Sequence, residues 1–213
     1  MPATTTRRRL SSSVDLHASL QQLAERAVAG RRNHDLVLGV HTNGRPSDVR
    51  VAAGDVDAEA PYYIASISKM FTAALVLQLV DEGHLRLDDR VVPLLGDYDL
   101  AGLHVPRDVD ATEQLEVHHL LHQTSGLGDY FNDNVEDQLA AGNDRSYSIQ
   151  DTIDVARMVG AAFPPGDRNG RRSLYSDTNY QLLTAIVETV VGDDYAAAVA
   201  QRIGVSCGCR RRR

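Results

Sequence analysis

Hydrophobic and polar residues alternate along this chain with two periodicities, one typical of strands and one typical of helices. Residues 14–29 carry apolar side chains at helical spacing, which predicts an amphipathic helix. Two short apolar segments, 36–41 and 49–53, flank an Asn43-Gly44 turn signal, and this arrangement predicts an antiparallel hairpin. The elements expected after the hairpin are all helices: 66–80, 117–123, 149–159, one that Ser176 or Asp177 caps and that runs to Val190, and 194–203. The pattern therefore predicts an α+β fold that is mostly helical.

The helix expected over 66–80 is apolar around nearly its whole circumference, so we expect it to be buried on most sides. Near its start lie Ser66 and Lys69, which are three positions apart and would share one face. Lys69 is the single lysine of the chain, whereas the other 21 of its 22 lysine and arginine residues are arginine. Arginine stays protonated in proteins, but a buried lysine can lose its proton and act as a base.

The Ser66/Lys69 pair has two interpretations. Burial and the positive end of the helix both lower the pKa of a lysine, which would make Lys69 a neutral base beside a serine nucleophile. In the alternative, the pair marks an ordinary surface helix start, with Ser66 as the cap and Lys69 in solvent. The local pattern by itself leaves both interpretations open.

Composition limits the class of protein. A chain of 213 residues with 43% hydrophobic and 24% charged residues is typical of a soluble globular protein, most simply of one domain. The net charge of −7 disfavours nucleic acid as a partner, and we interpret the arginine clusters at 7–9 and 210–213 as disordered ends. No apolar segment has membrane-spanning length or the character of a secretion signal, so we expect a cytoplasmic protein without a membrane partner.

Candidate metal ligands are few. Cys207 and Cys209 lie too close together and too near the end to form a disulfide framework. His118, His119 and His122 are close in sequence but have no acidic partner at the spacing of a metal site. We therefore expect neither a metal nor another cofactor.

Three motifs follow the Ser-x-x-Lys pair in a fixed order: HQTSGL at 122–127, FPPG at 163–166 and YSDTNY at 175–180. Together they resemble the serine β-lactamase-related superfamily, and more narrowly its branch of class C β-lactamases, D,D-carboxypeptidases, D-aminopeptidases and related esterases. The resemblance spans roughly Leu36 to Ile203. It implies a β-lactamase/transpeptidase-like α+β fold and a serine hydrolase that acts on an ester, an amide or a D-amino-acid peptide.

The resemblance also implies roles for four residues. Ser66 would attack a carbonyl and form an acyl-enzyme, and Lys69 would help to take its proton. Tyr175 would serve as general base in acylation and as general acid to the leaving group. Asp177 stands where the family has a substrate-binding asparagine, and a carboxylate can accept hydrogen bonds but cannot donate them. Asp177 could therefore hold Lys69 protonated or change the acyl groups accepted, which makes β-lactam hydrolysis less expected than ester hydrolysis.

Beyond Ile203 the resemblance implies further sheet strands and a Lys-Thr-Gly or His-x-Gly motif, which this sequence does not contain. We interpret residues 1–13 as a disordered N-terminus, 14–203 as a partial serine hydrolase domain, and 204–213 as an aberrant Cys/Arg-rich tail. We expect catalysis to be impaired by the truncation. The alternative is a non-catalytic remnant or binding module of the same fold.

Overall fold

The computed structural model describes residues 13–30, 32–41, 49–143, 145–166 and 172–204. These residues form two compact units, one that ends at Tyr63 and one that begins at Ile64. The Asn43-Gly44 turn, the Arg7–Arg9 cluster and the Cys/Arg-rich end lie outside the described residues.

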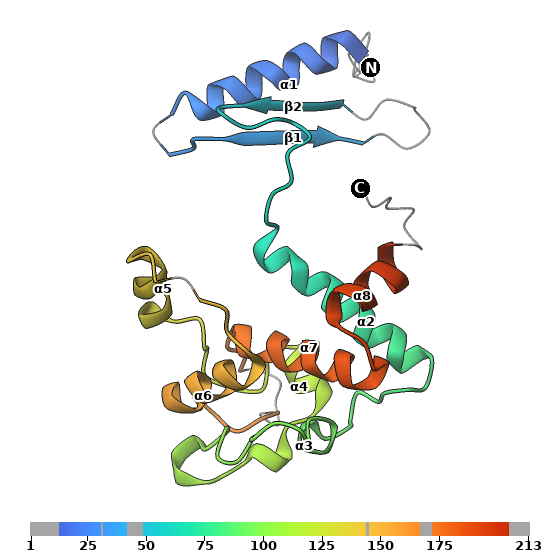
Figure 1. Cartoon of the computed structure of the whole chain (residues 1–213), viewed down its shortest axis with the longest axis vertical. Helices are drawn as coiled ribbons and strands as arrows, with labels where there is room; N and C mark the ends of the chain where they lie inside the picture. Colours follow the sequence, from blue (N-terminus) through green and yellow to red (C-terminus); the bar gives the residue numbers. More distant parts are fainter. Residues whose placement is uncertain (1–12, 31, 42–48, 144, 167–171, 205–213) are drawn as a thin grey trace, which may run out of the picture. The chain divides into compact units, whose positions relative to one another are not determined.

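The first unit consists of one helix on a two-stranded antiparallel sheet (Figure 1). Helix α1 spans Ser13–Val28, strand β1 spans Leu36–Val40 and strand β2 spans Val49–Ala53. The strands pair with Leu36 opposite Ala53 and Val40 opposite Val49. Every second residue of β2 is buried, as expected for a strand with one face on a helix. The helix and the hairpin predicted from the sequence are both confirmed.

The second unit is helical, and its helices are, in chain order, α2 (Lys69–Asp81), α3 (Val91–Leu94), α4 (Val117–Leu121), α5 (Asp133–Ala140), α6 (Ile149–Val159), α7 (Asp177–Val191) and α8 (Tyr195–Val199). Helix α7 contacts α2, α3, α4, α6 and α8 and is the centre of this unit (Figure 1). Its side chains Leu182, Leu183 and Ile186 are fully buried. No helix in the described part of the chain is long and apolar enough to cross a membrane.

The predicted helix 66–80 is wrong at its start and in its burial. Ser66 lies in a 3₁₀ turn, Ala65–Ser68, and the α-helix begins only at Lys69. Ala65, which opens the turn, has a φ of 45°, in the left-handed region that residues with a Cβ rarely adopt. The helix buries Leu75, Val76 and Leu79 on one side. It exposes more than half of the Met70 and Leu77 side chains, so it is not buried on most sides.

Local capping explains where other helices begin. The Ser148 hydroxyl accepts a hydrogen bond from Asp151 N (3.1 Å) while the Asp151 carboxylate accepts one from Ser148 N (2.8 Å), which confirms the predicted cap of α6. Helix α5 was not predicted, because two large apolar residues, Val135 and Leu139, are too few to indicate a helix from the sequence. Ser176 precedes α7 as expected, but its hydroxyl donates to Gly128 O instead of capping the helix.

We predict that acid destabilises the protein through two buried histidines. Burial lowers the pKa of His104 to about 4, and burial together with neighbouring positive charge lowers that of His119 to about 4. An unfolded histidine titrates near 6.5, so the unfolded chain binds protons that the folded chain does not as the pH falls from about 6.5 to 4. The melting temperature should therefore fall by several degrees across this window.

The matched variants are His104→Leu and His84→Leu. His104 is fully buried, whereas the side chain of His84 is 61% exposed. The first variant should show a shallower decline of melting temperature with acid, and the second should follow the wild type. Parallel pH profiles of melting temperature for all three proteins would show that His104 does not contribute to the destabilisation by acid.

Candidate active site

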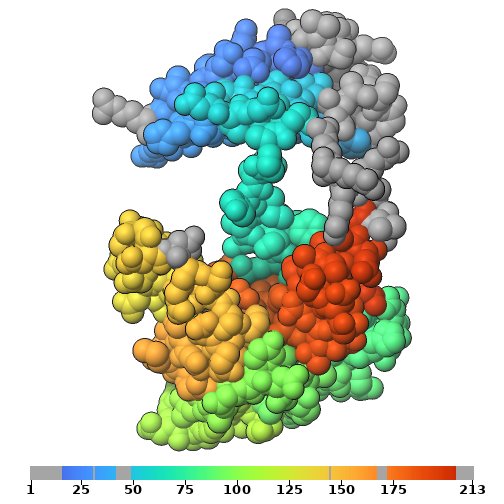
Figure 2. Space-filling model, viewed as in Figure 1, coloured from blue at the N-terminus to red at the C-terminus, as the bar shows by residue number. Residues whose placement is uncertain are grey.

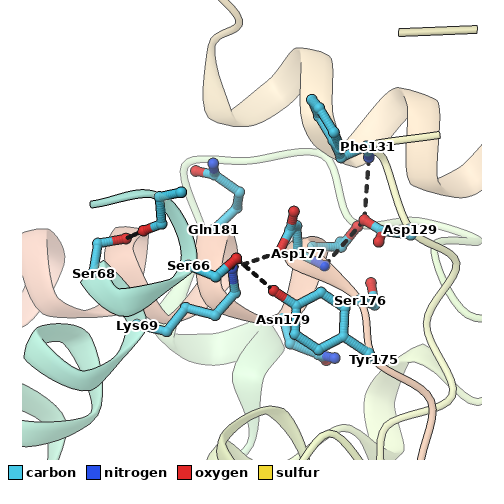
Figure 3. A network of polar contacts seen from close by, with 12 residues as sticks. Ser66, Ser68, Lys69, Asp129, Phe131, Tyr175, Ser176, Asp177, Asn179 and Gln181 are labelled. Atoms are coloured by element: carbon cyan, nitrogen blue, oxygen red, sulfur yellow. Dashed lines mark hydrogen bonds and ion pairs between the residues drawn. The ribbon is translucent and has the colours of Figure 1, made fainter. Parts of the chain in front are cut away.

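Ser66 lies at the centre of a short-range polar cluster (Figure 3). Its Oγ is 2.9 Å from Tyr175 Oη, and Lys69 Nζ donates a hydrogen bond to it at 3.2 Å. The 3₁₀ turn is closed by Ser68 Oγ, which donates to Ala65 O at 2.7 Å. The structure thus brings together three of the four residues singled out in the sequence, with the serine hydroxyl in contact with both partners.

Asp177, the fourth residue, forms an ion pair with Lys69. Lys69 Nζ lies 2.5 Å from Asp177 Oδ1, and both side chains are largely buried, with 18% and 23% of their surfaces exposed. The ammonium group also lies 5.2 Å from the ring centre of Tyr175 and 5.8 Å from that of Tyr180, within the range of cation–π attraction. Every close neighbour of Lys69 Nζ named here therefore favours its charged form.

These contacts set the protonation state of Lys69. Burial by itself lowers the lysine pKa, but the hydrogen bonds and charge of Asp177, with a further contribution from Tyr175, outweigh burial and raise it above its ordinary value. The surroundings therefore favour the ammonium form of Lys69 over the neutral base that burial and the helix start would favour. The alternative, in which Asp177 holds Lys69 protonated, agrees with the geometry.

The cluster opens into a cavity of about 530 Å³. Ser66, Lys69 and Asp177 form one part of its wall. The rest of the lining is mainly aromatic and hydroxyl side chains: Thr72, Tyr130, Phe131, Tyr180, Gln181, Thr184 and Tyr195, with Ala65 and Ser68. Figure 2 shows the surface of this unit hollowed between α5, in yellow, and the C-terminal helices, in red. A pocket of this size accommodates a small organic substrate.

Several cavity residues were not identified from the sequence. Tyr130 Oη accepts a hydrogen bond from Gln181 Nε2 at 3.0 Å, and the hydroxyls of Thr72 and Tyr195 are 2.8 Å apart. Tyr130 follows Gly128 and Asp129, which come directly after the HQTSGL motif, and this position was the available signal for it. Thr72 and Tyr195 lie on helices far apart in the sequence, so no local pattern could link them.

Asp129 was also missed as a site residue, although it borders the same motif. Its Oδ1 accepts hydrogen bonds from the backbone N–H groups of Asp177 (3.0 Å) and Phe131 (3.1 Å), as Figure 3 shows. Burial raises the pKa of the Asp129 carboxyl above its usual value. Asp129 therefore ties the loop after HQTSGL to the first residue of α7, where Asp177 begins the helix.

Glu116 is an acidic neighbour of the histidine group that the sequence did not reveal. Among the described residues, Glu116, His118 and His119 could bring three ligand atoms within 4.8 Å of one another. Their atoms already make other contacts: His119 Nδ1 accepts from Glu116 N (3.1 Å), and Glu116 Oε1 is 3.2 Å from Arg90. The arrangement caps the N-terminus of α4, and the adjacent guanidinium opposes a cation there.

The fold and this cluster define the class of protein, and comparison with known proteins identifies the family. The family model described as Beta-lactamase matches residues 20–208, so the chain belongs to that family. It is 32% identical to penicillin-binding protein 4 of Amycolatopsis lactamdurans over 82% of this chain and 40% of that protein. It is 30% identical to esterase EstB of Burkholderia gladioli over 93% of this chain and 51% of that protein.

Solved structures agree on the fold. A D-stereospecific amidohydrolase from Streptomyces sp. superposes with a TM-score of 0.72 and 30% identity, covering 90% of this chain and 54% of that one. The α+β, β-lactamase/transpeptidase-like fold expected from the motifs is therefore confirmed. The chain spans about half the length of these relatives.

We predict that replacing Asp177 by asparagine lowers the pKa of Lys69. The variant removes the carboxylate that raises this pKa and leaves the burial that lowers it. Because Lys69 is the only lysine, biosynthetic incorporation of [¹³C]lysine gives one side-chain NMR signal whose titration reports this group directly.

The wild-type signal should titrate above the ordinary lysine value, and the Asp177→Asn signal should titrate below the wild type. Asp97→Asn, which removes an exposed carboxylate, is the matched control and should leave the titration unchanged. A titration that is the same in wild type and Asp177→Asn would contradict the assigned effect of the ion pair.

Proposed function

We propose that Ser66 is the nucleophile of an acyl-enzyme serine hydrolase and that Tyr175 is its general base. The observation that carries the proposal is the joint contact of the Ser66 hydroxyl with Tyr175 Oη and Lys69 Nζ at the wall of the cavity. A nucleophile within hydrogen-bond distance of its base, with a third group that orients them, is the expected geometry for covalent catalysis.

The proposed reaction proceeds in two steps. Ser66 Oγ bonds to the substrate carbonyl carbon as its proton passes to Tyr175 Oη, and the Tyr175 hydroxyl proton passes in the same relay to the leaving alcohol or amine as the carbonyl–leaving-group bond breaks, so Tyr175 keeps one proton throughout. Water then attacks the resulting ester, releases the acid and restores the Ser66 hydroxyl. Lys69, as a cation 3.2 Å from Ser66 Oγ, stabilises the negative charge that develops during proton transfer.

The proposed substrate is a small ester. Asp177 lies at the cavity wall, where its carboxylate is paired with Lys69. A carboxylate also has no N–H group to donate to a substrate carbonyl. Recognition of an acylamino group, as in a peptide or a β-lactam, would lose a donor there, whereas a simple acyl ester does not need it. The name of the Burkholderia gladioli relative, an esterase, supports this choice, while that of the Streptomyces relative keeps amides as the second substrate class.

A non-catalytic binding module of the same fold is the second candidate. The buried Lys69–Asp177 ion pair favours it, because a lysine held in its charged form cannot assist Tyr175 as a second base. In this case the cavity would bind a small molecule or peptide without forming a covalent bond. Covalent labelling separates the two candidates.

We predict that a fluorophosphonate forms one covalent adduct with the wild-type protein and that Ser66→Ala abolishes it. Intact mass measures the adduct, and hydrolysis of a p-nitrophenyl ester should fall at least roughly a thousandfold in the variant. Ser146→Ala, which changes an exposed serine outside the cavity, is the control and should label like wild type. A cooperatively melting wild type that forms no adduct would instead support the binding module.

We predict that Tyr175→Phe retains Ser66 but slows its acylation by about a hundred- to ten-thousandfold, the usual contribution of a general base. The variant removes only the hydroxyl in contact with Ser66 and keeps the ring beside Lys69. Stopped-flow release of p-nitrophenol measures acylation directly. An unchanged rate in a stably folded variant would exclude Tyr175 as the base.

A further inference from the structure

Within the proposed catalytic cluster, Tyr175 is the residue whose position is least constrained by regular secondary structure. It belongs to residues 172–176, which form neither helix nor strand, and 53% of its surface is exposed. A tyrosine in such a segment can move away from its partner both by rotation of the side chain and by displacement of the backbone. The 2.9 Å contact with Ser66 therefore requires a constraint on the backbone at Tyr175.

One residue, Gln123, holds the backbone on both sides of Tyr175. Leu174 N donates to Gln123 O at 3.0 Å, and Ser176 N donates to the side-chain Gln123 Oε1, also at 3.0 Å. The two hydrogen bonds bracket the tyrosine and limit both the position and the direction of its Cα–Cβ bond. Gln123 itself has no contact with Ser66 or Lys69 among the interactions given above.

The side chain of Gln123 is in turn held by buried groups. Its Oε1 also accepts from Asn179 Nδ2 at 2.5 Å, and Asn179 is fully buried in α7. Asn179 Oδ1 accepts from the buried Ser125 Oγ at 2.6 Å, and Ser125 Oγ accepts from Leu127 N at 3.1 Å. Hydrogen bonds to buried groups limit the freedom of the Gln123 side chain and hold the carbonyl that binds Ser176 N in place.

The backbone of Gln123 adds an independent argument. It follows His122, the C-cap of α4, and has a φ of 58°, in the left-handed region. Glycine is the usual residue just after a helix C-cap, because it has no Cβ to strain. Glycine would satisfy the backbone at this position but would supply no side-chain acceptor for Ser176 N. Such strain persists where the surrounding contacts compensate for it, and it clusters at functional sites.

We propose that Gln123 is a positioning residue that sets the distance between Tyr175 and Ser66 through the peptide groups on either side of Tyr175. This inference rests on the proposed function, in which Tyr175 takes the proton of Ser66. It extends that function to a residue of the HQTSGL motif that lies outside the cavity lining.

The test compares Gln123→Leu with Gln123→Glu. Leucine has a similar reach and no acceptor, whereas glutamate retains an oxygen for Ser176 N and Asn179 Nδ2. Gln123→Leu should slow acylation by a p-nitrophenyl ester about 10- to 100-fold with little change in KM, since a small misplacement of a catalytic group has an effect of that order. Gln123→Glu should recover the rate to within about threefold of wild type, because it preserves the contact with Ser176.

A double-mutant cycle with Tyr175→Phe shows whether Gln123 acts through Tyr175. If it does, Gln123→Leu should have no further effect once the tyrosine hydroxyl is absent. An equal slowing in both backgrounds would overturn the proposal, because Gln123 would then act independently of Tyr175.

Gln150→Leu is the matched control for general loss of stability. Gln150 also joins two segments through its amide, accepting from Asp99 N (2.9 Å) and donating to Asp99 O (3.3 Å), but it lies outside the cavity. It should melt at a lower temperature with an unchanged acylation rate. If Gln123→Leu does not fold, Gln123→Gly, which relieves the left-handed backbone strain, takes its place with the same expected slowing.

Failure of the proposed function is distinguishable from failure of this inference. If wild-type protein does not acylate, the proposed function fails, and ¹⁹F NMR of protein that contains 3-fluorotyrosine then decides the positioning. Tyr175→Phe assigns the resonance of residue 175. A single sharp wild-type signal that broadens or splits in Gln123→Leu but not in Gln150→Leu supports the positioning role, and an unchanged signal overturns it.

Discussion

The ion pair between Lys69 and Asp177 is the interaction on which the arrangement of the site depends. It joins the first residue of α2 to the first residue of α7, and both partners are largely buried. A buried charge without a partner would be strongly unfavourable, so removing either partner leaves the other in a medium that solvates it poorly. The pair therefore fixes the separation of the two helix starts and the position of the ammonium beside Ser66 at the same time.

A second set of contacts holds the loop after α4 against the start of α7. Gly128 O accepts hydrogen bonds from Ser176 Oγ (3.1 Å) and Thr178 Oγ1 (2.8 Å), and Thr178 Oγ1 accepts from Tyr130 N at 3.0 Å. Polar groups with no access to water must find partners within the protein, and here the loop after α4 and the start of α7 supply them to each other. Residues without helical or strand hydrogen bonds thus acquire defined positions, which is what a tyrosine in an irregular segment needs to act at a fixed distance.

The charge of Lys69 and the aromatic wall of the cavity depend on neighbouring tyrosine side chains. Lys69 at the wall is neutralised by Asp177 and flanked by the rings of Tyr175 and Tyr180, while Tyr130 forms part of the wall beyond. Aromatic surfaces favour apolar groups and also attract a cation, so the Tyr180 ring both lies beside Lys69 and lines the cavity. The ion pair with Asp177 and the two flanking rings together favour a charged lysine in this largely buried position next to a serine hydroxyl.

Much of the fold could be predicted because its signals are local. The hairpin, α1, α6 and the long α7 were recognised from residue spacing and from residues adjacent to each helix start, such as Ser148 and Asp151. Helix α5 was missed because its two large apolar residues, Val135 and Leu139, lie at helical spacing but are too few to predict a helix. The start of α2 was misplaced because the left-handed Ala65 and the 3₁₀ turn at Ser66 depend on backbone geometry that side-chain spacing does not encode.

The sequence by itself determined that Ser66 and Lys69 lie on one face, that Tyr175 and Asp177 precede a helix, and that the motifs follow the order of one family. Only the tertiary structure placed a carboxylate from another helix beside Lys69, and this carboxylate outweighs burial and raises the lysine pKa. It also decided that Gln123 brackets Tyr175 and that one side of α2 is exposed. Protonation, positioning and burial depend on the surroundings of a group, and those surroundings come from segments distant in the chain.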